Sequence, residues 1–332
     1  MGKRVVTFGE VMMRLSGIGH ARLMQAASLD VVYAGAEANV AVALSNMGIN
    51  TVHVTRFPDN DLGRAAVNTL RMQGVDTSHI LFGKERMGIY FVENGAMQRP
   101  SRIIYDRYES AFAHIKPGMV DWKEVLKDAS WLHWTGITPA VSQGAADACM
   151  EAVTQAFQSG VKVSGDINYR RVLWKYGKNA IDVMPSLIAK SHYIVGGAAD
   201  VENCTGLKAG SFEEAAVLLR KNFSSVIAMA NVDRELVNAS HNRIGGAIWT
   251  DSGISRSRSY DLTHIVDRIG AGDAFMAGWI YSILNDRAPQ EQIDFAAAAC
   301  ALKHSIEGDA NLVSAMEIQD LVGGVNVGKL LR

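Results

Sequence analysis

Cysteine is scarce in this sequence: only three of the 332 residues are cysteine, and Cys149, Cys204 and Cys300 lie far apart. An odd number at such spacing fits neither a disulfide framework nor a zinc site, so we expect reduced thiols in a cytoplasmic protein. An excess of one charge is also missing, because 33 basic residues stand against 34 acidic ones. Without a basic stripe, a nucleic-acid partner is not expected.

Long apolar runs are missing as well. The stretch 295–302 is too short to cross a bilayer and ends at Lys303. Glu10 lies where a signal peptide would need its apolar segment. We therefore expect no membrane partner and no secretion.

Several motifs that would point to other enzyme classes are not present. The sequence has no Walker A motif, which argues against a P-loop phosphate site. No GxGxxG follows the first expected strand, which argues against a dinucleotide-dependent dehydrogenase. The nine histidines form no HExxH or other metal-type group. Internal repeats and low-complexity linkers are also missing.

What is present is an alternation of strand-like and helix-like segments. Short β-branched or aromatic runs alternate with stretches in which apolar residues recur every three or four positions. Such alternation predicts a mostly parallel sheet with helices on both faces. The strands expected from it are 4–9, 50–54, 131–134, 162–166, 193–195 and 225–229, and the clearest helices are 38–47, 142–158 and 274–284.

One region departs from this alternation. Residues 87–92 and 102–108 are strand-like, and Asn94-Gly95 between them is a strong hairpin signal. Together with 31–33 they predict a small antiparallel sheet apart from the main one. We expect a lid built from roughly 11–35 and 86–112, inserted into a single domain of residues 1–332.

The most informative stretch is Gly270-Ala271-Gly272-Asp273, which leads into the expected helix 274–284. Small residues at a helix start expose free backbone N–H groups at the positive end of the helix dipole, which suits a transferred phosphoryl group. Asp273 would then be placed to accept a proton from an attacking hydroxyl. The same pattern also fits a plain N-terminal cap, since Asp favours that position. Spacing alone does not decide between the two.

Resemblance to known proteins favours the catalytic interpretation. The segment GAGDAF at 270–275 resembles the signature of the ribokinase-like carbohydrate kinases, and AGAEANVA at 34–41 is similar to that family's N-terminal sugar-binding motif. The resemblance covers essentially the whole chain. It implies a three-layer α/β/α core with a small β-sheet lid, and ATP-dependent phosphorylation of a sugar with Mg²⁺. Whether a monovalent cation is also needed stays open.

Further segments are similar to the branch of that family that phosphorylates 2-keto-3-deoxygluconate at its 6-hydroxyl. These segments are YDR at 105–107, DINYR at 166–170, ASHN at 239–242 and KHSIEGDAN at 303–311. The resemblance makes Asp273 the base and Gly270, Ala271 and Gly272 the anion hole. It implies sugar contacts at Gly35, Asn39, Tyr90, Tyr105, Arg107, Arg170 and Asp309, nucleotide contacts at Asn168, Ala297, Gly270 and Gly272, and a metal contact at Asp200.

The arginines also point to an acidic acceptor. The period of two in strand 102–108 puts Tyr105 and Arg107 on one face, where they could hold a carboxylate and a hydroxyl. Each residue also has a structural interpretation. Arg107 could be a solvated lid residue, Tyr90 a packing residue, Arg170 a partner of a surface carboxylate, and Asp309 a helix cap.

Three departures from the family pattern affect mainly the nucleotide side. Ala34 replaces the first glycine of a Gly-Gly pair, where a methyl group could cause strain. Residues 196–200 keep only Asp200 of a usual Asn-Glu run, and 228–233 lack the usual Gly and Lys. Two alternatives therefore stay open: another acceptor (fructose, ribose or a galactose-derived keto acid), or a catalytically weak sugar-binding protein. Exposed lid edges predict a homo-oligomer.

Overall fold

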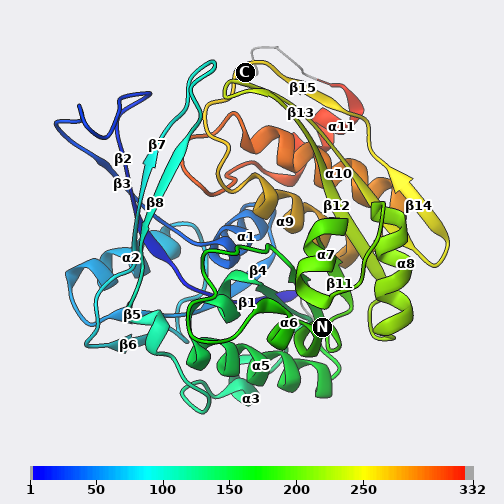
Figure 1. Ribbon diagram of the computed structural model, residues 1–332, viewed down its shortest axis with the longest axis horizontal. Coiled ribbons are helices and arrows are strands. Elements are labelled where there is room, and N and C mark those ends of the chain that lie inside the picture. Colours follow the sequence, from blue (N-terminus) through cyan, green and yellow to red (C-terminus); the bar gives the residue numbers. More distant parts are fainter. Residues whose placement is uncertain (1–2, 326–332) are drawn as a thin grey trace.

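The computed structural model describes residues 3–325. Strands and helices alternate along most of this range (Figure 1). The strands are β1 (Arg4–Phe8), β2 (Met12–Ser16), β3 (Asp30–Ala34), β4 (Asn50–Val54), β5 (Arg56–Pro58), β6 (Leu81–Gly83), β7 (Ile89–Glu93), β8 (Arg102–Asp106), β9 (Trp131–Thr135), β10 (Lys162–Asp166), β11 (Tyr193–Val195), β12 (Ala228–Asn238), β13 (His241–Thr250), β14 (Gly253–Arg256) and β15 (Tyr260–Leu262). The helices are α1 (Ala36–Asn46), α2 (Asp61–Met72), the 3₁₀ turn η1 (Phe112–His114), α3 (Trp122–Val125), α4 (Ile137–Val141), α5 (Gln143–Gln158), α6 (Ala180–Ile188), α7 (Ala198–Thr205), α8 (Phe212–Asn222), α9 (Ala271–Leu284), α10 (Pro289–Lys303) and α11 (Ala315–Gly323).

A nine-stranded sheet forms the core, in the order β14-β13-β12-β11-β10-β9-β1-β4, with β15 also paired to β13. The strands from β12 to β4 run parallel, and β13, β14 and β15 extend the sheet by antiparallel pairing. Buried apolar runs such as Val5, Val6 and Phe8 in β1 are typical of a parallel sheet covered on both faces. The predicted mostly parallel sheet is confirmed.

Helices cover both faces of this sheet (Figure 1). One face packs against α5, α6, α7 and α8, through a core that includes Trp134, Met184 and Leu219. The other packs against α1, α9, α10 and α11, through residues such as Leu44 and Phe275. This arrangement is the predicted three-layer α/β/α core.

A four-stranded sheet in the order β3-β2-β7-β8 stands apart from the core and forms the lid (Figure 1). Its strands fall within the two segments expected for the lid. The prediction of a purely antiparallel sheet is wrong, because β2 lies between β3 and β7 and runs parallel to β7. Strand β2 was not predicted from the sequence.

Element boundaries agree closely where apolar runs define them. Strands β4, β10 and β11 begin and end where predicted, and Ser142, the first residue expected in α5, is its N-cap and accepts a hydrogen bond from the amide of Ala145. Strand β8 stops at Asp106, so Arg107 lies just beyond it. Strand β12 begins later than expected and runs on to Asn238. No helix within residues 3–325 is long and apolar enough to span a membrane.

Candidate active site

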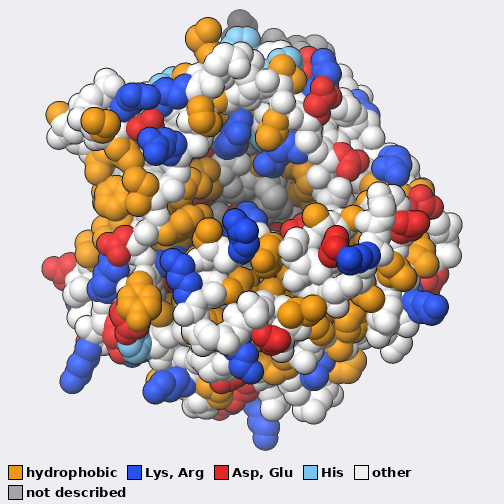
Figure 2. Space-filling view, viewed as in Figure 1, with side chains coloured by type: hydrophobic (Ala, Val, Ile, Leu, Met, Phe, Trp, Pro, Cys, Tyr) orange, Lys and Arg blue, Asp and Glu red, His pale blue; other side chains and the backbone are white. Residues whose placement is uncertain are grey.

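A cavity of about 540 Å³ lies between the lid and the carboxyl ends of the core strands. Figure 2 shows it as a hollow near the centre of one face, with Lys and Arg side chains around its rim. All but one of the residues assigned to the site from the sequence line it. These are Gly35, Asn39, Tyr90, Tyr105, Arg107, Asn168, Arg170, Asp200, Gly270, Ala271, Gly272, Asp273 and Asp309.

The exception is Ala297, which is fully buried in α10 and does not line the cavity. Helices α9 and α10 pack closely there: a β-carbon at Gly278 would come within 3.0 Å of Ala296 Cα. Ala296 and Ala298, the neighbours of Ala297, belong to the apolar core, so this part of α10 is packed inside the protein and not at the cavity.

The anion loop, residues 267–272, lines the floor of the cavity and leads into α9. Gly270 is the N-cap, with φ 79°, a left-handed conformation that favours glycine. A β-carbon at Gly270 would also lie 1.7 Å from the carbonyl oxygen of Asp309, so no other residue fits there. The amides that follow Gly270 are at the start of α9 and lack partners earlier in the helix, as an anion hole requires.

Asp273 is the third residue of α9 and faces the cavity. Its carboxylate accepts a hydrogen bond from the side-chain amide of Asn39 at 2.7 Å, and no side chain caps α9. The helix-cap interpretation is therefore not supported. Burial raises the pKa of Asp273 to about 8, the Asn39 hydrogen bond opposes that shift, and the negative charges of Asp166 and Asp309 add to it.

Arg107 is buried and forms an ion pair with Glu10, a residue that the sequence analysis did not select. Its Nε donates to Glu10 Oε2 at 2.8 Å, and Nη2 donates to the same oxygen. The other oxygen of Glu10 accepts from Ser110 at 2.5 Å. Arg107 is thus no solvated lid residue, and Glu10 fixes its orientation beside the cavity. Its Nη1 has no hydrogen-bond partner within the described part of the chain.

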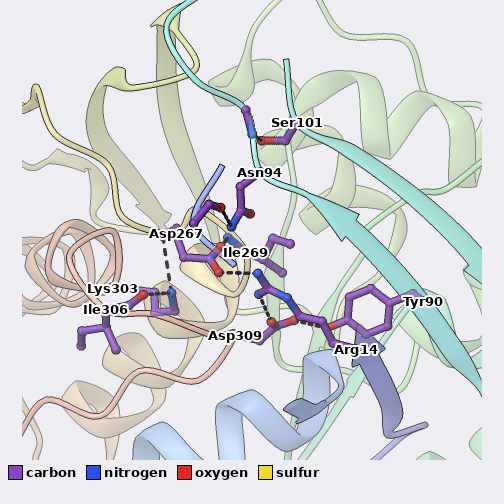
Figure 3. A network of polar contacts seen from close by, with 11 residues as sticks. Arg14, Tyr90, Asn94, Ser101, Asp267, Ile269, Lys303, Ile306 and Asp309 are labelled. Carbon is purple, nitrogen blue, oxygen red and sulfur yellow. Dashed lines mark hydrogen bonds and ion pairs between the residues drawn. The ribbon is translucent and has the colours of Figure 1, made fainter. Parts of the chain in front are cut away.

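Two tyrosines of the lid stack beside this pair. Tyr90 and Tyr105 lie 6.0 Å apart between ring centroids, and the Tyr90 hydroxyl donates to the carboxylate of Asp309. Tyr90 is buried, whereas 45% of Tyr105 is exposed. Asp309 is not a helix cap: it accepts from Tyr90 and from Arg14, which lies on β2. Figure 3 shows Arg14 and Tyr90 converging on Asp309.

The opposite wall carries two carboxylates. Burial, together with the nearby charge of Asp200, raises the pKa of Asp166 to about 7. Asp200 accepts from the amide of Gly197 at 3.0 Å, which fixes it at the start of α7. Asn168 is next to them with φ 39°, a strained backbone for asparagine, and its side-chain oxygen has no partner among residues 3–325.

Further arginines complete the rim. Arg170 is exposed and donates to the carbonyl of Tyr169, so it is not paired with a surface carboxylate within residues 3–325. Arg234 and Arg268 also line the cavity, and neither had been predicted. Arg268 donates to the carbonyl of Ala239 at 3.0 Å. Burial lowers its pKa, and the charge of Arg234 lowers it further.

The lid tip meets the β12–β13 hairpin above the cavity. Ala239 donates its amide to the carbonyl of Met97 at 2.9 Å, and the amide of Met97 donates to Ser240 Oγ at 3.1 Å.

Ala34, the departure from the Gly-Gly pattern, ends β3 and is not among the residues with positive φ. The expected backbone strain is therefore absent at Ala34, and its methyl group lines the cavity.

Comparison with known proteins places this geometry in context. Residues 2–315 match the model of the pfkB family of carbohydrate kinases. The chain is 31% identical to 2-dehydro-3-deoxygalactonokinase of Haloferax volcanii over 99% of both chains. It is 29% identical to 2-dehydro-3-deoxygluconokinase of Thermoproteus tenax over 96% of this chain and 94% of that one. The crystal structure of 2-dehydro-3-deoxygluconokinase from Thermotoga maritima superimposes with a TM-score of 0.93 at 38% identity, covering 97% of this chain and 100% of that one.

Proposed function

The chain belongs to the pfkB family of carbohydrate kinases, and we propose that it transfers the γ-phosphoryl group of ATP to the 6-hydroxyl of 2-keto-3-deoxygluconate. The products are 2-keto-3-deoxy-6-phosphogluconate and ADP. The proposal depends above all on one juxtaposition: Asp273, held by Asn39 at 2.7 Å, lies beside the anion loop in the cavity. The substrates named for the relatives at 29% and 38% identity support the choice of acceptor.

The cavity floor supplies the chemistry of transfer. Asp273 accepts the proton of the 6-hydroxyl as that oxygen attacks the γ-phosphorus. The amides that follow Gly270 donate hydrogen bonds to the charge that develops on the moving phosphoryl group. Removing one such donor lowers kcat by about 10²–10³ in other enzymes. The lid keeps water out, which would otherwise compete with the sugar for the phosphoryl group.

The recognition of an acid comes from two arginines, one beside the lid and one in the core. Arg107, just beyond lid strand β8, keeps its Nη1 free of Glu10, and Arg170, in the loop after β10, is exposed; we assign these two cations to a carboxylate. Tyr105 and Asp309 are placed to bond hydroxyl groups. A neutral sugar such as fructose or ribose offers no group that needs two cations.

The opposite side fits a Mg–nucleotide. Arg234 and Arg268 form no ion pair with a carboxylate in the described range, so their charges are free to meet phosphates. Asp166 and Asp200 fit Mg²⁺, which proteins hold through one or two carboxylates together with phosphates and water. When bound, Mg²⁺ neutralises charge on the phosphate oxygens. These groups take the place of the Asn-Glu run and the Lys that the sequence lacks.

The galactose-derived keto acid is the second candidate acceptor, because the relative from Haloferax volcanii is named for it at 31% identity. The two acids are epimers, so a single hydroxyl distinguishes them. The ratio of the two kcat/KM values decides which one the cavity prefers.

The test measures ADP release with Mg-ATP and a panel of both keto acids, gluconate, fructose and ribose, with and without K⁺. Turnover of the keto acids that Asp273→Asn abolishes is the expected result. Turnover confined to a neutral sugar contradicts the assigned acceptor. No turnover, with calorimetry that detects sugar binding but no Mg-ATP binding, supports a sugar-binding protein instead.

Arg107→Ala tests the recognition of the acid, and its design must take Glu10 into account. Removing the arginine alone leaves a buried carboxylate without its partner, which costs about 3–5 kcal/mol of stability. The double variant Glu10→Gln/Arg107→Gln avoids the unpaired charge. We expect it to lose about 10²-fold or more in kcat/KM for a keto acid through KM. If both variants match the wild type in kinetics, Arg107 does not bind the acid.

A further inference from the structure

Arg14 on lid strand β2 is buried between two carboxylates of the core. Its Nη1 lies 2.5 Å from Asp309 Oδ1, and its Nη2 lies 2.7 Å from Asp267 Oδ2. Only 2% of Arg14 is exposed, and Figure 3 shows its guanidinium between Asp267 and Asp309. The family resemblance assigned no role to Arg14 or Asp267.

One carboxylate belongs to the anion loop and the other lies against it. Asp267 begins the loop, and its Oδ1 accepts from the amide of Ile269 at 3.0 Å, which fixes the turn that leads to Gly270. Asp309 packs against Gly270, since its carbonyl oxygen occupies the space that a β-carbon there would need. One guanidinium therefore joins the anion loop to the segment that carries Asp309.

A contribution to folding stability does not by itself explain why Arg14 is buried between two carboxylates. Buried ion pairs are often no more stabilising than apolar residues of the same shape, because both charges lose their hydration. Arg14 is also closed to a ligand: it is 2% exposed and is not among the residues that line the cavity, and its Nε is buried without a partner within residues 3–325. Lys303 Nζ is beside it, donating to the carbonyl of Ile306 at 3.0 Å. Such a cluster instead holds its charged groups in a fixed geometry.

We infer that Arg14 is a positioning residue of the proposed kinase: it holds the Asp309 carboxylate for the sugar and the anion loop for the phosphoryl group in one fixed relation. This inference rests on the proposed function. Arg14 touches neither ligand. It acts through Asp309, whose Oδ2 also accepts from Tyr90, and through Asp267.

The charge of Asp309 gives this role a pH signature. Burial raises the pKa of Asp309, and Arg14 is the strongest influence that opposes the rise. The other groups that face this carboxylate are Tyr90 from β7, Asp267 from the anion loop, Lys303 from α10 and Asp273 from α9. Without Arg14 the pKa of this carboxyl rises further, so a larger share of it is protonated at a given pH and cannot accept from a substrate hydroxyl. Raising the pH reverses this loss.

The experiment compares Arg14→Met and Arg14→Lys with the wild-type protein. The matched control is Arg56→Met, which removes another largely buried ion pair, to Glu85 at 2.8 Å, away from the cavity. We expect Arg14→Met to lose about 10²-fold in kcat/KM for the acceptor at about pH 7, mainly through KM, and its kcat/KM relative to the wild type at the same pH to rise as the pH is raised to about 9. Arg14→Lys keeps the charge but has one nitrogen for two carboxylates, so it falls in between. Arg56→Met keeps the wild-type pH profile.

Hydrogen exchange separates this inference from the proposed function. Arg14→Met is expected to speed amide exchange in 267–272 and to leave β10 unchanged, whereas Arg56→Met leaves both unchanged. If the anion loop keeps wild-type exchange rates, Arg14 does not position it, whatever the protein phosphorylates. An equal loss of kcat/KM at all pH values likewise overturns the role of Arg14 in setting the charge of Asp309.

Discussion

Asp273 must be deprotonated to act as a base, yet burial raises its pKa to about 8. At the scale of single residues, this one value governs how the reaction responds to pH. Asn39 donates to the carboxylate and favours its charged form, but it does not cancel the effect of burial. Near neutral pH most free enzyme therefore carries a protonated base.

We predict that kcat/KM for the acceptor rises about tenfold per pH unit below a pKa near 8, and levels off above it. The measurement is initial ADP release at low acceptor and saturating Mg-ATP, because kcat/KM reports the free enzyme. A profile that is flat between about pH 6 and about pH 9 contradicts the assignment of Asp273 as the base.

The same carboxyl links stability to pH. Its folded-state pKa of about 8 lies above the ordinary value of 3.8, so the folded protein binds this proton more tightly than the unfolded chain. Wild-type stability should therefore fall as pH rises from about 4 to about 8. In the variant Asp273→Asn the side chain is an amide, which does not titrate.

We predict that the free energy of unfolding of Asp273→Asn, relative to the wild type, increases by about 1 kcal/mol per pH unit across that interval. Urea unfolding at about pH 5 and about pH 8 measures the difference. Asp30→Asn, at the exposed start of β3, is the control and should show no such trend. A constant difference at both pH values contradicts the raised pKa.

The sequence identified the site residues that stand in recognisable motifs, and it missed their charged partners. Asp273 and Asn39 were predicted and lie in contact. Arg14 and Glu10 were not, because their partners Asp309 and Arg107 are far away in the sequence. The structure places Arg14 on the buried face of β2 together with Met12, and no pattern in the sequence indicated that burial.

At the scale of elements, the start of α9 depends on one glycine. Gly270→Ala meets two obstacles, a positive φ and a contact of 1.7 Å with the Asp309 carbonyl. Gly160→Ala, just beyond α5 at φ 72°, meets only the first, since nothing lies within 4 Å of its β-carbon. Comparing the two variants separates the effect of backbone strain at positive φ from the effect of the steric clash with Asp309.

We predict that Gly160→Ala loses about 1 kcal/mol of stability and no activity, whereas Gly270→Ala loses more stability and about 10²-fold or more in kcat. Thermal unfolding and single-turnover kinetics measure the two effects. Equal loss of stability in both variants, with kcat unchanged, shows that the anion loop does not need its exact backbone path.

Elements were predicted from the sequence where burial leaves a local apolar pattern. Elements that depend on pairing with another strand were missed. Strands β10 and β11 are buried and were predicted to the residue. The second half of β12 is exposed and polar, and it is a strand because its whole length pairs with β13. Strand β2 was missed because it pairs with β7, which no local pattern could indicate.

At the scale of the whole molecule, the lid has an exposed edge. All five residues of β8 are exposed, and 55% of Ile104 is accessible on the face opposite Tyr105. An unpaired apolar edge strand favours pairing with a second strand. We propose that two copies of the chain associate through the lid.

We predict that Ile104→Lys shifts the protein from dimer to monomer, because a charge on the edge strand opposes pairing. Sedimentation velocity at micromolar concentration measures the state. Leu236→Lys, on the exposed part of β12, is the control and should leave the dimer intact. A monomeric wild-type protein contradicts the proposed association.

The ion pair between Arg14 and Asp309 joins positions that are 295 residues apart. During synthesis on the ribosome, the residues of β2 and β7 are added to the chain long before Asp309. Arg14 then lies in a lid that has no Asp309 to pair with, and the site forms only once the segment that carries Asp309 has been added. A chain that ends just before Asp309 would contain most of the fold and lack the carboxylate that completes the sugar site. Addition of the segment that carries Asp309 is therefore the assembly step of the site.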